Sequence, residues 1–297
     1  MKKKNLYLLL LLFGTCFWGM SFPITKLAVQ GSSVALFLLY RFILATFVLS
    51  VVFRKQFKST SSKEITAGFL LAFPLLSSII LQINGLKLID ASQCTFIAGL
   101  SVIIVPVLKR IIFKTVLPVK TWTASLIALT GLFVIAVSGD FNFNQGTLYA
   151  VAGALAFSLY LLQVEKYTAE INIRNTIVPM FVCCALLCLL YVNFDHVKTS
   201  WIPDNKSFWL AIVFCSVFST AYMYSVSMLS QMYLSAEKIA VIFLFEPIFG
   251  TVASFFILNE NITVRLLLGG GLIFFAMIIY EIRFKKSVKA ADYSEFS

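Results

Sequence analysis

Long apolar runs alternate with short polar segments along the whole chain. Each run covers roughly 17 to 26 residues, and apolar side chains occupy every face of the helix that it would form. A helix needs about 20 apolar residues to cross the hydrocarbon layer of a membrane, whereas strands of a membrane barrel alternate polar and apolar residues over about ten positions. The pattern therefore predicts ten membrane-spanning helices, at 6–25, 34–53, 66–87, 93–113, 120–137, 147–164, 176–194, 207–232, 239–258 and 264–282.

The composition agrees with this prediction. Hydrophobic residues make up 60% of the 297 positions and charged residues 12%, against about 25% charged residues in a typical soluble domain. A soluble fold of this size could not bury so much apolar surface, so lipid must cover much of it. The connections between the runs are short and leave no room for a separate soluble domain. The expected fold class is an all-α polytopic membrane protein.

The net charge of +11 indicates membrane topology rather than nucleic-acid binding, because the basic residues lie between the apolar runs. If the N-terminus is cytoplasmic, 18 of the 24 Lys and Arg residues fall in cytoplasmic segments. Membrane proteins carry such an excess on the cytoplasmic side. The first run lacks a convincing signal-peptide cleavage site and is expected to remain as the first helix. We therefore predict an integral protein of a bacterial cytoplasmic membrane with both termini in the cytoplasm.

The two halves of the chain show weak internal similarity. A shift of 145 residues aligns Ala91 with Ala236 and Ile97 with Ile242. Each half holds five predicted helices, and because five is odd, the second half must be inverted relative to the first. Inverted repeats recur in secondary transporters, where the substrate site lies between the repeats. The predicted domains are a first repeat at 1–138, a second repeat at 139–286 and a cytoplasmic tail at 287–297.

Glu246 is the most informative polar residue within a predicted span. It lies roughly 12 Å into the ninth span, and Pro247 follows it and removes a backbone hydrogen bond. Ionisable residues within spans are costly and usually functional. A carboxylate at such a helix break could bind a cationic group or carry a proton. The alternative is a protonated or internally paired structural glutamate.

Two basic residues lie in the outer halves of the first two spans. Arg41 is around 10 Å from the outer end of the second span, where it could attract a carboxylate or a phosphate, or pair with Glu246. Lys26 lies at the outer end of the first span. It could make the cavity entrance positive or extend its ammonium group to the membrane interface.

Other polar and aromatic side chains within the spans suit either a cavity lining or helix packing. The candidate substrate-binding residues are Trp18, Ser21, Arg41, Gln82, Asn84, Tyr160, Gln163, Tyr222, Ser225 and Glu246. Three acidic residues at span ends are interpreted as boundary residues: Glu165, Glu237 and Glu260. No metal site is predicted, because the six cysteines lie within apolar runs, where cysteine behaves as a small hydrophobe.

Short motifs recur in order along both halves of the chain. They are Phe17–Phe22 with Lys26, Tyr40–Phe42, Phe96–Val102 running to Pro106, and, in the second half, Ala236, Glu246–Pro247 and Glu260. Because of these motifs, residues 6–282 resemble the EamA domains of the drug/metabolite transporter superfamily. The resemblance implies two inverted five-helix repeats around a central cavity, and transport of amino acids, other metabolites or toxic compounds. Thr115 departs from the pattern, because the first repeat usually has a glutamate there.

The predicted function is secondary active transport of a small organic metabolite by alternating access, by efflux or exchange. The opposite charges of Arg41 and Glu246 would suit a zwitterion such as an amino acid or an amino-acid-derived compound. The alternatives are import of a nucleoside-like or S-adenosylmethionine-like metabolite, and a component of a flippase for a lipid-linked substrate.

Direct use of ATP is not expected, because no Walker-type nucleotide-binding sequence occurs. Protons or a counter-substrate would then drive transport. Enzymatic activity is not expected either: the single histidine, His196, lies in a loop, and Asp90, Asp140 and Asp195 fall near span ends. We predict no cofactor and no nucleic-acid partner, and a monomer or homodimer in the lipid bilayer.

Overall fold

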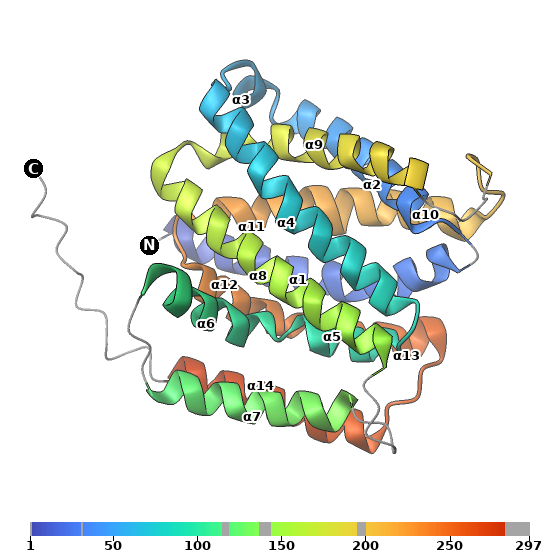
Figure 1. Ribbon diagram of the computed structural model, residues 1–297, viewed down its shortest axis with the longest axis vertical. Helices are drawn as coiled ribbons and strands as arrows, with labels where there is room; N and C mark the ends of the chain where they lie inside the picture. The colour runs from blue at the N-terminus through green and yellow to red at the C-terminus, as the bar shows by residue number, and fades with distance from the viewer. Residues whose placement is uncertain (1, 31, 115–118, 137–143, 195–199, 283–297) are drawn as a thin grey trace, which may run out of the picture.

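The computed structural model describes residues 2–30, 32–114, 119–136, 144–194 and 200–282, which form helices and connections without a β-strand. The helices of the first half are α1 (Lys2–Val29), α2 (Val34–Val52), α3 (Arg54–Lys58), α4 (Ser62–Leu86), α5 (Ala91–Ala98), α6 (Ser101–Phe113) and α7 (Val119–Ala136). The helices of the second half are α8 (Gln145–Glu170), α9 (Ile173–Phe194), α10 (Lys206–Phe214), α11 (Met223–Ser230), α12 (Ala236–Ile242), α13 (Glu246–Leu258) and α14 (Val264–Ile282). They pack into one bundle, with α7 and α14 paired along one edge (Figure 1).

Eight helical segments in the described parts of the chain are long and apolar enough to cross a membrane. They are Lys3–Val29, Val34–Val52, Ser62–Leu86, Ala91–Phe113, Gln145–Glu170, Ile173–Phe194, Lys206–Ser230 and Ala236–Leu258. They match the first to fourth and the sixth to ninth predicted spans. α7 and α14, with 18 and 19 residues, occupy the positions predicted for the fifth and tenth spans. Because these two helices are not among the eight segments, the total of ten membrane spans remains a prediction.

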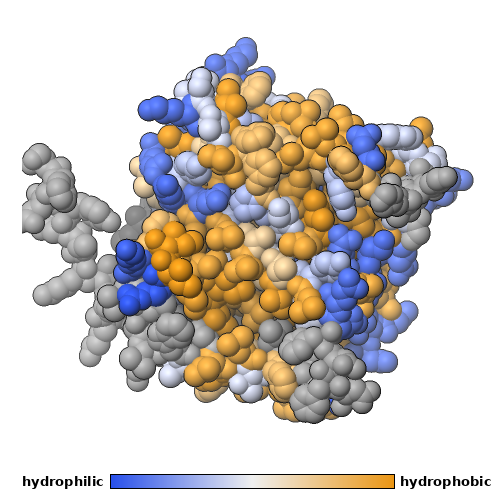
Figure 2. All heavy atoms as spheres, in the orientation of Figure 1, coloured by the Kyte–Doolittle hydropathy of each residue, from blue (hydrophilic) through white to orange (hydrophobic). Residues whose placement is uncertain are grey.

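The surface has the character of an integral membrane protein. Figure 2 shows a broad hydrophobic band between hydrophilic ends of the bundle. Large apolar side chains are exposed on several helices, among them Leu9 on α1, Phe47 on α2 and Phe256 on α13, the last being 75% exposed. Large contiguous apolar patches are rare on soluble monomers, whereas lipid tails solvate such a surface well.

The fourth and ninth predicted spans are both broken helices. The break beside Glu246 and Pro247 was predicted from the sequence, whereas the break in the fourth span was not. The first break separates α5 from α6 at Gly99 and Leu100, and the second is a 3₁₀ turn, Phe243–Phe245 (η2), between α12 and α13. At the second break, Pro247 lies at the start of α13. Proline has no N–H to donate to the preceding turn, so one helical hydrogen bond is missing there.

The two broken segments begin and end at matching positions. α5 begins at Ala91 and α12 at Ala236. α6 ends before Lys114, which has a left-handed φ of 54°, and α13 ends before Asn259, with a φ of 53°. Both the starts and the ends are 145 residues apart, which is the shift that aligns the two halves in sequence.

The eighth predicted span changes its helical geometry in the middle. Cys215–Tyr222 form a π-helical segment (η1) between α10 and α11. π-helical turns are rare and occur frequently at functional sites. This segment packs against both α1 and α2.

α1 and α13 approach each other closely at Gly19. A Cβ atom added to Gly19 would lie 2.6 Å from the backbone nitrogen of Gly250 and 2.7 Å from the carbonyl oxygen of Glu246. Backbone atoms cannot move aside as the end of a flexible side chain can. Small residues allow membrane helices to approach in this way, and here the contact holds α13 against the first half.

Replacing Gly19 by valine should force α1 and α13 apart and lower the melting temperature of the detergent-solubilised protein. Overpacking costs about 1–3 kcal/mol, and each kcal/mol lowers the melting temperature of a large domain by roughly 2–4 °C. Gly271→Ala is the matched control, since no atom lies within 4 Å of a Cβ added there. Equal melting temperatures for wild type and Gly19→Val would contradict the close approach.

Candidate substrate cavity

A small cavity lies inside the bundle and is lined by both halves of the chain. Its volume, counted as the space open to the centres of water molecules, is about 40 Å³, which is room for about three waters. Both helix breaks border it, the first through Gly99 and Ser101 and the second through Phe243 and Glu246. Discontinuous helices at matching positions of two repeats are the usual location of a transporter's substrate site.

Arg41 on α2 is buried in the cavity wall and is 5% exposed. Its Nε donates a hydrogen bond to Thr220 Oγ1 over 2.6 Å, and its Nη2 donates to Ser219 Oγ over 3.2 Å. Among the described residues, no carboxylate lies within ion-pair distance of its guanidinium. The pairing with Glu246 that the sequence left open is therefore not present. Two neutral hydroxyl groups instead accept hydrogen bonds from the Arg41 guanidinium.

The π-helical segment η1 supplies the partners of two cavity residues. Ser219 and Thr220 present their hydroxyl groups to Arg41, and the carbonyl oxygen of Ser219 accepts a 2.8 Å hydrogen bond from Nε1 of Trp18. The second half therefore fixes the orientation of an arginine and a tryptophan from the first half. Neither Ser219 nor Thr220 was among the predicted substrate-binding residues, although the many hydroxyl side chains of this span, Ser219 included, indicated a face that lines a cavity or packs against other helices.

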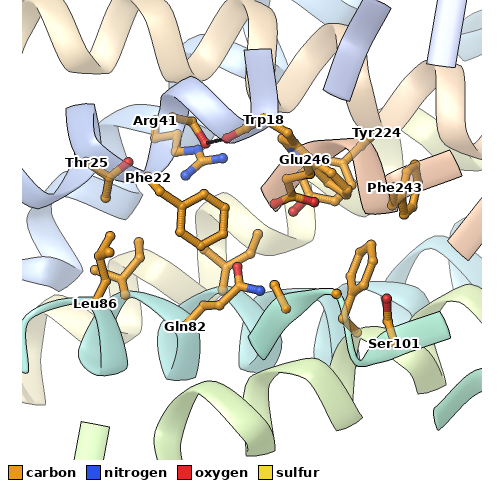
Figure 3. A pocket seen from close by; sticks show the side chains of 16 residues that line it. Trp18, Phe22, Thr25, Arg41, Gln82, Leu86, Ser101, Tyr224, Phe243 and Glu246 are labelled. Atoms are coloured by element: carbon orange, nitrogen blue, oxygen red, sulfur yellow. Dashed lines mark hydrogen bonds between the residues drawn. The ribbon is translucent and has the colours of Figure 1, made fainter. Parts of the chain in front are cut away.

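Glu246 stands in the first turn of α13 and is 6% exposed. Figure 3 shows its carboxylate and the Arg41 guanidinium pointing into the cavity, with Gln82 of α4 on the opposite wall. Within the described parts of the chain, Glu246 has no side-chain hydrogen bond and no ion pair. The partial positive charge of a helix N-terminus favours a carboxylate in the first turn. Nevertheless, a cationic ligand group or a proton would be its natural partner.

Aromatic rings form the apolar part of the cavity wall. Trp18 packs edge to face against Phe157, Tyr224 and Phe243, with ring centroids 5.4, 5.2 and 4.8 Å apart. Phe22 also lines the cavity. Such packing gives a rigid wall and leaves few alternative rotamers. Phe22, Phe157 and Phe243 were not predicted as site residues; Phe22 belongs to the Phe17–Phe22 motif, but its apolar side chain gave no sign that it lines a cavity rather than packing against a helix.

Five of the ten predicted substrate-binding residues line this cavity: Trp18, Ser21, Arg41, Gln82 and Glu246. The other five do not line it. Asn84 donates to the carbonyl of Ile80 over 2.8 Å, and Tyr222 donates to the carbonyl of Leu10 over 2.9 Å. Tyr160 stacks on Phe157 from behind the aromatic wall. Tyr160, Gln163 and Ser225 have buried polar atoms without a hydrogen-bond partner among the described residues.

A charged cluster, here called the Lys26 cluster, joins the end of α1 to the start of α5 and to Glu260. Nζ of Lys26 donates to the carbonyl of Ile89 over 2.8 Å and lies 3.3 Å from Glu260 Oε1 and 3.8 Å from Asp90 Oδ1. Glu260 also accepts from the N–H groups of Ala91 (2.7 Å) and Ser92 (3.0 Å) and from the Ser92 hydroxyl (2.8 Å). Lys26 is therefore engaged within the protein, where Glu260 caps the N-terminus of α5.

The pKa of the Glu260 carboxyl is held below its ordinary value. Partial burial by itself would raise it, but hydrogen bonds from Ser92 and Ala91 and the charge of Lys26 favour the ionised form more strongly. Glu260 therefore stabilises the folded protein most fully above the ordinary pKa of glutamate, about 4.3. This contribution is lost as the pH falls from there through the folded-state pKa.

We expect wild type to melt at a higher temperature than Glu260→Gln at pH 7, and the difference to shrink as the pH falls below about 4. A contribution of about 1 kcal/mol would give a difference of roughly 2–4 °C at pH 7. Thermal unfolding of both variants across this pH range is the measurement, and Glu170→Gln in an exposed ion pair serves as control. A difference that stays constant down to pH 3 would contradict the assignment.

A second cluster, the Lys109 cluster, joins α6 to α8 and α12. Nζ of Lys109 lies 2.9 Å from Oε1 of Glu165 and 2.9 Å from Oε1 of Glu237. All three acidic residues that the sequence analysis treated as boundary residues therefore form ion pairs. Across the described residues, no group of three or more His, Cys, Asp or Glu side chains is placed to hold a metal ion.

The fold and the cavity define a polytopic membrane protein with an internal site between two halves. The family model of EamA-like transporters matches residues 5–137 and again residues 144–281. The chain belongs to this family, which is consistent with the drug/metabolite transporter superfamily.

Similar proteins carry transporter names. An uncharacterized transporter of Archaeoglobus fulgidus is 25% identical over 90% of this chain and 82% of its own length. The uncharacterized transporter YdfC of Bacillus subtilis is 23% identical over 91% of this chain and 89% of its own. A solved crystal structure matches the fold with a TM-score of 0.71 at 14% identity, covering 95% of this chain and 99% of that one.

Proposed function

We propose that the protein is a secondary active transporter that moves a small zwitterionic metabolite, an amino acid or an amino-acid-derived compound, across the cytoplasmic membrane by efflux or exchange. The observation that carries the proposal is one buried cavity holding two opposite charges that do not pair with each other. Arg41 is suited to a ligand carboxylate and Glu246 to a ligand ammonium group. Burying either charge without a partner is costly, so a ligand that pairs with both is favoured.

The arrangement of the helices supports alternating access between two inverted repeats. α4 packs on α8 and α9, and the corresponding segments α10, η1 and α11 of the second half pack on α1 and α2. α1 packs on α13 as α8 packs on α6, while α2 pairs with α9 and α7 with α14. Exchanging the halves therefore reproduces the same set of contacts. Related halves of this kind can rock around a central site.

Proton coupling is part of the proposal, and Glu246 is the proton carrier. It is buried, points into the cavity and has no partner in the described structure. A carboxylate that meets a cationic group in one step and a proton in another would link the two fluxes, because both compete for the same charge. Arg41 carries a permanent charge and remains the anion-binding group throughout.

A thermal-shift screen of the purified protein tests the substrate class. The panel comprises amino acids, betaines, nucleoside-like and S-adenosylmethionine-like metabolites, and cationic drugs. A ligand at 100 times its Kd raises the free energy of unfolding by about 2.7 kcal/mol, a readily measured shift. We expect zwitterions to stabilise wild type strongly, Glu246→Gln less strongly because the ligand keeps its contact with Arg41, and Arg41→Met least. Stabilisation only by nucleoside-like metabolites or by cationic drugs would replace the proposed class.

A further inference from the structure

The Lys26 cluster and the Lys109 cluster lie at opposite ends of the bundle. The first contains the start of α5 and Glu260, two residues beyond the end of α13, whereas the second contains the last turns of α6 and the start of α12. α5–α6 and α12–α13 each form one apolar span, so the two ends of each span belong to different clusters. In Figure 1 the start of α5 and the end of α13 lie to the right, and α6 and α12 lie to the left.

Each cluster ties the first half to the second. In the Lys26 cluster, Lys26 and the N-terminus of α5 are held by Glu260 from the second half. In the Lys109 cluster, a lysine from the first half is held by Glu165 and Glu237 from the second half. Opening either end of the cavity by moving the halves apart must therefore break the cluster at that end.

The cavity lies between the clusters along both broken spans. Gly99 and Ser101 come between Ala91 and Lys109 in the chain, and Glu246 comes between Glu237 and Glu260. With both clusters intact, the cavity measures about 40 Å³, far below the ~300 Å³ or more of an ordinary ligand pocket. The cavity is therefore too small to hold an ordinary metabolite while both clusters are formed.

We propose that the two clusters are latches, each holding one end of the substrate cavity shut, and that transport proceeds by opening one latch while the other stays closed. Ion pairs suit this role because the separated charges become hydrated when the end opens. Much of the lost attraction is then recovered from water. Opening an apolar contact would instead expose apolar surface to the entering water, which is unfavourable. The proposal rests on the transport function proposed above.

The two latches differ in construction although the surrounding helices correspond. A shift of 145 residues places Thr115 opposite Glu260, so the first repeat lacks the carboxylate that caps α5 from the second. The Lys109 latch has, in place of that cap, a lysine held between the side chains of two glutamates. The Lys26 latch also uses backbone N–H groups. Neutralising one lysine should therefore release the Lys109 latch more completely than the Lys26 latch.

Sided labelling of a cysteine in the cavity tests the latches without a known substrate. Ser101→Cys places a thiol in the lining, and mass spectrometry quantifies its reaction with a membrane-impermeant methanethiosulfonate in right-side-out and inside-out vesicles. We expect Lys26→Met and Glu260→Gln to accelerate labelling several-fold from one side. Lys109→Met should accelerate it from the opposite side. Lys166→Met, in the exposed pair with Glu170, is the matched control and should leave both rates unchanged.

Three outcomes would overturn the latches: unchanged labelling in all cluster variants, acceleration from the same side for both clusters, or equal acceleration by the control. If Glu260→Gln fails to fold, Lys26→Met tests the same latch, because it removes the other partner of the ion pair. The charge exchange Lys109→Glu with Glu237→Lys should restore slow labelling in part, since it re-forms the ion pair between α6 and α12 but places a glutamate beside Glu165. Failure of the ligand screen with this labelling pattern intact would overturn the zwitterionic substrate and leave the latches standing.

Discussion

Replacing Glu246 by glutamine is expected to reduce proton-driven flux to the background of protein-free liposomes. The carboxylate is buried in the cavity wall and has no partner among the described residues. Glutamine has nearly the same size and shape as glutamate but cannot take up a proton. The measurement is flux of the ligand from the thermal-shift screen into proteoliposomes under an imposed pH gradient, with an entrapped pH-sensitive dye reporting the proton flux.

The same variant separates proton coupling from ligand binding. Downhill exchange of ligand should be affected far less than gradient-driven flux if the ligand retains its contact with Arg41. Glu170→Gln, which removes an exposed carboxylate on α8, should behave as wild type in both assays. Wild-type gradient dependence in Glu246→Gln would remove Glu246 from the coupling mechanism.

Arg41→Met is expected to lower the affinity for zwitterionic ligands by at least ~30-fold, since losing one partner of a buried charge pair costs about 2–5 kcal/mol. An analogue without the carboxylate should bind wild type and Arg41→Met with similar affinity, because it makes no contact with the guanidinium. Isothermal titration of both ligands against both proteins measures the coupling. Arg41→Lys should also be weakened, because a lysine cannot reproduce the fork of donors.

Loss of folding must be separated from loss of binding in this experiment. Arg41→Met leaves the hydroxyls of Ser219 and Thr220 without their donor, which costs about 1–3 kcal/mol for a buried polar group. Melting temperatures of the ligand-free variants give this contribution directly. Arg54→Met, at an exposed position on α3, is the matched control. Equal loss of affinity for both ligands would show that Arg41 does not recognise the carboxylate.

Much of the fold could be predicted because membrane helices are dictated locally. A run of about 20 apolar residues must satisfy its own backbone hydrogen bonds in lipid, so it forms a helix whatever lies beside it. Eight predicted spans are confirmed as helices of sufficient length. The break at η2 was predicted from Pro247, which removes a helical hydrogen bond. The break at Gly99 and Leu100 and the π-helical geometry of η1 had no comparable signal.

The candidate site could be predicted only in part. Arg41 and Glu246 stand out in any reading of the sequence, because a charge within a membrane span is rare and costly. Which hydroxyls hold Arg41, and which of the 30 phenylalanines form the wall, depends on contacts between helices far apart in the chain. Trp18 and Ser219, for example, are 201 residues apart.

The sequence by itself determined that this protein crosses a membrane and places two opposite charges within its spans, since hydrophobic length and buried charge are properties of single segments. Only the tertiary structure decided that those charges share one cavity without pairing, and that Lys26 and Lys109 form ion pairs with acidic residues of the other half at opposite ends of the bundle. Ion pairs and cavity walls depend on distances of a few ångströms between separate helices. The packing of the whole bundle sets those distances.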